Sequence, residues 1–200
     1  MINFLSIFPC PFFNLDTNPE FGEIRNELID FCYNERENDP IGEHRSNYNS
    51  WHSISYKDQE RFQKYRNFIE NSLKQFSDKF LLEQSKLILT SAWININGKN
   101  SSNSVHNHPG CDLSGCLWIK STKNSGSIRF ENPNHFSQFK LINHCNFETK
   151  SKISFSDYYW FKPIEGQMLL FPSEIRHCVL ENTDDEDRIS IAFNLNCCEK

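Results

Sequence analysis

Residues 105–110, Val105-His106-Asn107-His108-Pro109-Gly110, decide the fold that we expect for this chain. Side chains alternate between the two faces of an extended strand, so His106 and His108 would point to the same side. A third imidazole from far along the chain, His177, could complete a three-ligand face on one metal ion. Three protein ligands leave coordination positions open for a substrate or O2, as in catalytic metal sites. A His-x-His pair also occurs by chance on polar strands, so the flanking sequence must support this interpretation.

The length and composition limit the classes of protein to which this chain can belong. A chain of 200 residues with 18 Phe is long enough for one domain with a Phe-rich core, and we expect residues 1–200 to form a single domain. The net charge of -5 argues against general nucleic-acid binding. No apolar run reaches the length needed to span a membrane, and the apolar N-terminus lacks the basic region of a signal peptide. We expect it to form a first strand or arm packed on the core.

The eight cysteines include no C-x-x-C pair, so their spacing resembles neither a zinc ribbon nor a small disulfide scaffold. We interpret them as reduced, mostly buried thiols of a cytoplasmic protein. They are Cys10, Cys32, Cys111, Cys116, Cys145, Cys178, Cys197 and Cys198.

The N-terminal part, residues 1–84, favours two helices packed on one face of a sheet. The first is expected to begin at Asn18-Pro19, with Asn18 as N-cap, and to end near Tyr33. The second begins near Asp58, and its Phe stripe continues to Phe80. Between them, residues 34–53 are expected to be a loop. Trp51 in this loop either anchors it to the core or joins His52 in a substrate lid, and we favour the anchor.

From residue 85 the hydrophobic period changes from 3.6 to 2, which predicts the strands of a β core over residues 85–200. Many short strands at even spacing are typical of a sandwich or jelly roll. Residues 134–157 form an insert, either a loop or an edge hairpin, and the acidic run 184–187 is expected to be a solvated turn. The predicted strands cover residues 85–96, 104–108, 115–120, 127–131, 158–162, 167–171, 177–181 and 188–194.

Arg188 and Ser190 are again two residues apart on one predicted strand, so they share a face. An Arg side chain binds a carboxylate through two parallel hydrogen bonds, and a neighbouring hydroxyl adds a third. The alternative is a surface ion pair between Arg188 and the acidic residues just before it. Four aromatic residues are of the type that would line such a pocket, although residues of this type are more often simple core residues: Trp93, Trp118, Phe130 and Phe171.

These motifs, in this order, resemble the small 2-oxoglutarate/Fe(II)-dependent oxygenases of bacteria and phages, which are related to the prolyl hydroxylases. The resemblance covers most of the chain, and its order is more specific than any single motif. It rests on His106-x-His108-Pro109, Leu113-Ser114-Gly115, the stretches 125–133 and 163–177, and Arg188-Ile189-Ser190-Ile191-Ala192-Phe193-Asn194.

The resemblance implies a mainly β fold with added helices, a double-stranded β-helix (jelly roll), with Fe(II) and 2-oxoglutarate as cofactor and cosubstrate. It implies that O2 and 2-oxoglutarate are converted with release of succinate and CO2 while a substrate C–H bond is hydroxylated. His106 and His177 match the two metal histidines of the family. Arg188, with Ser190, matches the pair that holds the distal carboxylate of 2-oxoglutarate.

One position departs from the family pattern, which has His-x-Asp where this chain has His-x-His. Either His108 is the third ligand, which we favour, or Asp112 is, or water takes the third position while His108 only lines the pocket. Two rival functions also remain: a cupin-like three-histidine dioxygenase that needs no 2-oxoglutarate, and a non-catalytic jelly-roll binding module. The primary substrate could be a protein residue, a free amino acid or a small metabolite.

Overall fold

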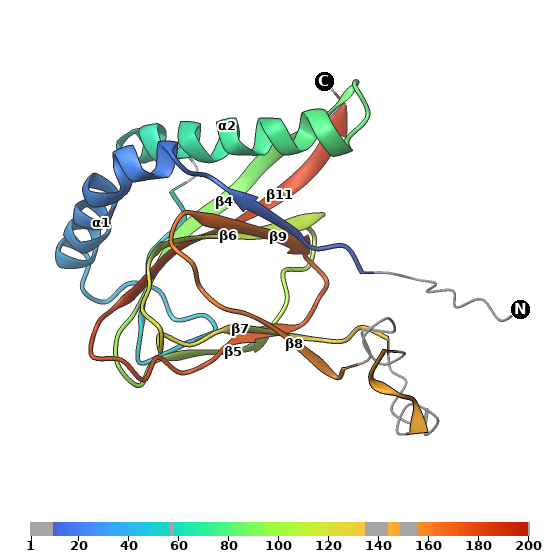
Figure 1. The fold of residues 1–200 in the computed structure, drawn as a ribbon. Coiled ribbons are helices and arrows are strands. Elements are labelled where there is room, and N and C mark those ends of the chain that lie inside the picture. The colour runs from blue at the N-terminus through green and yellow to red at the C-terminus, as the bar shows by residue number, and fades with distance from the viewer. Residues whose placement is uncertain (1–9, 57, 135–143, 149–155, 200) are drawn as a thin grey trace, which may run out of the picture.

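The computed structural model describes residues 10–56, 58–134, 144–148 and 156–199, and its β-strands form two antiparallel sheets that face each other (Figure 1). The six-stranded sheet has the order β1-β9-β6-β11-β4-β3. Its strands are β1 (Phe13–Asp16), β9 (Gln167–Pro172), β6 (Leu113–Lys120), β11 (Arg188–Glu199), β4 (Ser85–Asn97) and β3 (Trp51–His52).

The smaller, five-stranded sheet carries two of the three histidines and has the order β2-β5-β10-β7-β8. His106 and His177 are direct partners across the β5–β10 pair, because β5 ends at His106 and β10 begins at His177. Its strands are β2 (Asn47–Tyr48), β5 (Ser102–His106), β10 (His177–Val179), β7 (Ile128–Glu131) and β8 (Tyr158–Phe161).

Two helices cover the outer face of the larger sheet (Figure 1). They are α1 (Glu20–Asn38) and α2 (Gln63–Phe80), the second preceded by a short 3-10 turn, η1 (Glu60–Phe62). Their buried side chains pack against the outward-facing apolar residues of β4 and β11, such as Ile94 and Ile191. A second core cluster fills the space between the two sheets on the side of Phe130 and Phe171. The predicted jelly roll with helices on one sheet is therefore confirmed.

Helix α1 differs from its prediction at both ends. Pro19 occupies the N-cap position, and the Asn18 side chain donates a hydrogen bond to Asp16 instead of capping the helix. The helix continues to Asn38 because Glu35 is held from outside: its carboxylate accepts a 2.7 Å hydrogen bond from the Tyr56 hydroxyl. Strand β11 likewise runs five residues past its predicted end, because its C-terminal half pairs with the start of β4.

Three smaller expectations can be compared with the structure. Only Cys32, Cys116 and Cys178 are buried, so the prediction that most cysteines are buried is wrong. Residues 135–143 and 149–155, most of the predicted insert, lie outside the described residues. Within the described part of the chain, no helix is long and apolar enough to cross a membrane.

Candidate active site

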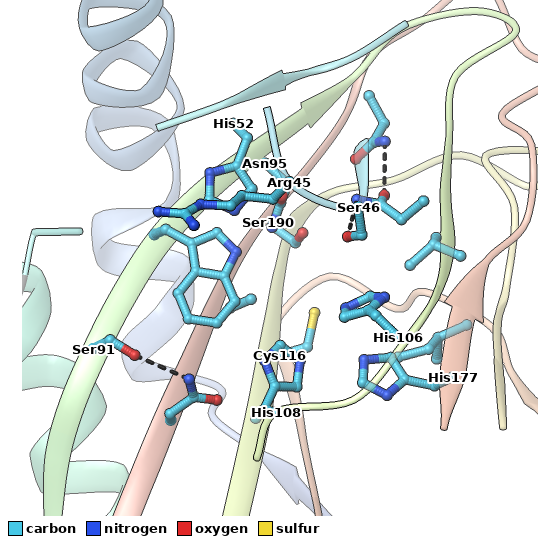
Figure 2. Close-up of a pocket in the computed structure, with 18 of the residues that line it drawn as sticks. Arg45, Ser46, His52, Ser91, Asn95, His106, His108, Cys116, His177 and Ser190 are labelled. Carbon is cyan, nitrogen blue, oxygen red and sulfur yellow. Dashed lines mark hydrogen bonds between the residues drawn. The ribbon is translucent and has the colours of Figure 1, made fainter. Parts of the chain in front are cut away.

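A pocket of about 650 Å³ lies between the two sheets (Figure 2). Its floor is the inner face of the larger sheet, and the strand register arranges that floor in rows. Arg188 of β11 pairs with Asn97, and two residues further along Ser190 lies between Asn95 of β4 and Trp118 of β6. The next rows are Cys116–Ala192–Trp93 and Ser114–Asn194–Ser91. The three histidines lie across the pocket from this floor.

The three predicted metal histidines come together in this pocket. One ring nitrogen from each of His106, His108 and His177 lies within 4.8 Å of the others. The ring centroids are 4.3 Å apart for His106 and His177, 5.0 Å for His106 and His108, and 5.2 Å for His108 and His177. His108 lies two residues beyond the end of β5, where its backbone N–H donates to the carbonyl of Ser173. It therefore reaches the site from a loop and not from the strand that we predicted.

Hydrogen bonds set the proton positions on two of these rings. His106 Nδ1 lies 2.8 Å from the carbonyl oxygen of Ser104, and His177 Nδ1 lies 2.9 Å from that of Ile175. A carbonyl only accepts, so each Nδ1 carries the proton and each Nε2 has a free lone pair. The second ring nitrogen of metal-binding histidines is held in the same way.

Burial keeps these imidazoles neutral. Desolvation, together with the neighbouring imidazoles, lowers the pKa of His108 to about 4 and that of His177 to about 3. Desolvation also lowers the pKa of His106. A neutral imidazole is the form that binds a metal, so at neutral pH the cluster presents lone pairs and no positive charge.

Asp112 is not brought to this cluster. Its side chain is exposed, and its Oδ2 accepts a 2.7 Å hydrogen bond from the backbone N–H of Cys197. The preceding Pro-Gly turn thus directs Asp112 towards the end of β11. Among the described residues, the only group of three or more potential metal ligands within reach of one another is the histidine cluster.

Arg188 is 2% exposed at the start of β11 and lines the pocket with Ser190. Its Nη1 donates to the backbone carbonyls of Ser125 and Gly126, whereas its buried Nη2 has no partner among the described residues. Burial lowers the pKa of the Arg188 guanidinium to about 10, so it remains charged at neutral pH. The pocket therefore holds a buried cation with an unused donor.

The alternative surface ion pair for Arg188 is wrong, because the acidic run interacts elsewhere. Asp185 pairs with Lys99, Glu186 with Lys120 and Asp187 with Arg36, while Asp184 accepts from the Thr122 hydroxyl. The acidic run 184–187 is the expected turn, and the side chains of Asp185 and Glu186 are exposed to solvent as predicted, although each also forms an ion pair.

Sequence reasoning placed the other pocket residues only in part. Trp93, Trp118 and Phe171 line the pocket, while Phe130 packs in the core beside the His177 ring. Trp51 anchors its loop as favoured: it is 6% exposed and its indole N–H donates to the Asp39 carbonyl.

Several polar lining residues escaped prediction, notably Arg45, Asn95 and Asn103. A signal for them was present in β4, where Ser91, Asn95 and Asn97 alternate with apolar residues and so mark a polar inner face.

Comparisons with known proteins identify the family and the fold. The family model described as "Putative 2OG-Fe(II) oxygenase" matches residues 91–194. Among solved structures, a prolyl-4-hydroxylase from Pseudomonas putida is similar with a TM-score of 0.63, 12% identity and coverage of 94% of this chain and 92% of that one. No curated protein sequence matches the chain.

Two further solved structures share the fold. SnoN, the alpha-ketoglutarate-dependent epimerase of nogalamycin biosynthesis, has a TM-score of 0.64 and 12% identity, and the match covers 96% of this chain and 81% of that one. HygX from Streptomyces hygroscopicus, with nickel and 2-oxoglutarate bound, has a TM-score of 0.62 and 11% identity, with coverage of 94% and 83%. The family match extends over more than half of this chain, so the protein belongs to the 2-oxoglutarate/Fe(II)-dependent oxygenases, enzymes whose cofactor and cosubstrate are Fe(II) and 2-oxoglutarate.

Proposed function

We propose that this enzyme is a dioxygenase that hydroxylates a C–H bond of its primary substrate and releases succinate and CO2. The observation that carries the proposal is that one pocket holds both a cluster of three neutral imidazoles and, on the opposite wall, a buried guanidinium with an unused donor. The first group suits a divalent metal and the second suits a carboxylate. A ligand with a metal-chelating end and a distal carboxylate needs both the metal site and the guanidinium.

We propose that His106, His108 and His177 hold the iron. They converge from a strand end, a loop and a strand start, and burial holds each ring in its metal-binding form. Imidazole suits iron as a ligand, and three protein ligands leave positions for a cosubstrate and for O2. Because no carboxylate belongs to this set, the site keeps one more positive charge than a two-histidine, one-carboxylate triad.

We propose that Arg188 and Ser190 hold the distal carboxylate of 2-oxoglutarate. The free Nη2 of Arg188 can donate to a carboxylate oxygen, and the Nη1 contacts with backbone carbonyls fix the guanidinium plane. The hydroxyl of Ser190 lies on the same face of β11, two residues along. Bound iron and 2-oxoglutarate would supply the oxidising chemistry, while these side chains orient the cosubstrate and Trp93 and Phe171 help to exclude water.

The three-histidine set also suits a cupin-like dioxygenase that needs no 2-oxoglutarate. That function gives no role to a buried cation in the pocket, and leaving such a group unpaired is energetically costly. The free Nη2 of Arg188 therefore favours the 2-oxoglutarate-dependent reaction.

The proposal is tested by anaerobic titration of the protein with Fe(II), with and without 2-oxoglutarate. We expect a visible metal-to-ligand charge-transfer band that requires both components, because only a chelated 2-oxo acid produces it. Bound iron without the band would favour the cupin-like enzyme, and a protein that binds no iron would be a non-catalytic binding module. On admission of O2, succinate formation measured by mass spectrometry should follow the band.

The third ligand is tested by comparing His108→Ala with Asp112→Ala. We expect His108→Ala to weaken Fe(II) binding by at least about tenfold, whereas Asp112→Ala should bind Fe(II) as the unaltered protein does. Isothermal titration under anaerobic conditions measures both affinities. The reverse pattern would make Asp112 the ligand, and two unaffected variants would leave the third position to water.

We further propose that residues 1–200 act as one domain and that the protein is cytoplasmic. The first is supported by the packing of α1 and α2 on the sheet that forms the pocket floor. The second is supported by the richness in cysteine without paired spacing, which suits a reducing compartment.

A further inference from the structure

The three imidazole rings of the site differ in the hydrogen bonds that hold them. His106 and His177 each donate Nδ1–H to a backbone carbonyl, at 2.8 and 2.9 Å. The ring of His108 has no hydrogen bond to any described residue; only its backbone N–H is bonded, to Ser173. Metal-binding histidines almost always have an outer hydrogen bond that fixes the ring, so the orientation of His108 must come from another source.

That source is ring packing. His108 contacts the rings of His106 and His177, which are themselves members of the cluster. Among the described residues, its one aromatic ring contact outside the cluster is with Trp93, whose ring centroid lies 5.6 Å away. Trp93 lies on the floor of the pocket, in the row of Ala192 and Cys116. The indole therefore forms the wall that limits how far the His108 ring can turn away from the other two.

Trp93 is in turn held by His52. The two rings stack with centroids 5.7 Å apart and planes 14° apart. His52 is 8% exposed, and its Nδ1 bonds to the carbonyl of Ser53 at 2.7 Å. Its own carbonyl accepts from the backbone N–H of Glu43, which also lines the pocket. A chain of contacts thus runs from Glu43 to His108. A backbone hydrogen bond joins Glu43 to His52, and ring contacts join His52 to Trp93 and Trp93 to His108.

We propose that Trp93, held by His52, is the positioning residue that orients His108 as the third metal ligand. The proposal rests on the metal site proposed above. It assigns to an aromatic stack the task that a carbonyl performs for His106 and His177. It also makes His108 the ligand whose coordination depends on the β3 edge of the pocket, where His52 lies.

Co(II) is the probe for this proposal, because its visible spectrum reports the number and type of its ligands while a titration reports affinity. We expect Trp93→Leu to weaken Co(II) binding on the order of tenfold and to change the spectrum towards that of His108→Ala. Trp93→Phe retains an aromatic wall and should restore most of the affinity. His52→Ala should shift both readouts in the same direction by less. Trp160→Leu is the control, because this half-exposed indole on β8 does not line the pocket and its loss should leave Co(II) affinity unchanged.

A double-mutant cycle separates positioning from a general structural role. If Trp93 acts through His108, Trp93→Leu should cost no further Co(II) affinity in a His108→Ala background. An equal loss in both backgrounds would overturn the proposal, as would a Trp93→Leu variant with the spectrum and affinity of the unaltered protein. Unfolding curves of each variant confirm that it is folded. Failure of the unaltered protein to bind Co(II) would instead refute the metal site itself, so the two failures are distinguishable.

Discussion

Replacement of His177 by alanine is expected to abolish stoichiometric Fe(II) binding. His177 is the most buried of the three imidazoles, it begins β10, and its Nδ1 bond to Ile175 directs Nε2 into the pocket. Loss of an outer-shell partner alone typically costs 10–100-fold in metal affinity, so we expect loss of this ligand to cost more than about 100-fold. Anaerobic titration with Fe(II), followed by metal analysis after desalting, measures the effect.

Two further variants make the His177 result interpretable. His177→Gln keeps a polar side chain of similar size, so an equal loss of iron cannot be ascribed to a cavity at this buried position. His44→Ala removes an exposed histidine that is not part of the cluster and should bind iron normally. Stoichiometric iron retained by His177→Ala would show that His177 is not a ligand.

Replacement of Arg188 by alanine is expected to spare the metal but to weaken 2-oxoglutarate binding steeply. Truncating one partner of a buried, hydrogen-bonded charge pair costs about 2–5 kcal/mol. At about 1.4 kcal/mol per tenfold, the 2-oxoglutarate concentration needed for half-saturation should rise about 30-fold or more. Titration of the charge-transfer band with 2-oxoglutarate at fixed Fe(II) measures this shift.

A comparison of two cosubstrates shows whether Arg188 acts on the distal carboxylate. 2-Oxopentanoate has the chelating end and chain length of 2-oxoglutarate but ends in a methyl group. The unaltered protein should bind 2-oxoglutarate far more tightly than 2-oxopentanoate, and Arg188→Ala should bind the two alike. Because the metal is held by other residues, Fe(II) affinity should stay within a few-fold in this variant. An unchanged preference for 2-oxoglutarate would contradict the role of Arg188 and favour the cupin-like enzyme.

Much of the fold could be predicted from local patterns. The change of period at residue 85 located β4, and alternation between turn signals located the short strands to within a few residues. The Phe stripe predicted from Phe62 to Phe80 located the buried face of η1 and α2 as far as Phe76, whereas Phe80 is 53% exposed. These features depend on which face of an element is apolar, and that information is local. The ends of α1 were predicted less well, because Asn18 and Glu35 form their side-chain bonds with Asp16 and Tyr56.

The sequence by itself determined the candidate chemistry: the His-x-His pair, the distant His177, and the Arg188–Ser190 pair on one strand face. Only the tertiary structure decided their arrangement. Pairing of β5 with β10 brings His106 opposite His177, and the turn at Pro109-Gly110 directs Asp112 away from the cluster. The acidic run contacts residues other than Arg188, whose Nη2 has no partner among the described residues. The physical reason is that these contacts join residues far apart in the chain. They depend on which strands pair, and a pattern along one segment does not identify its partner strand.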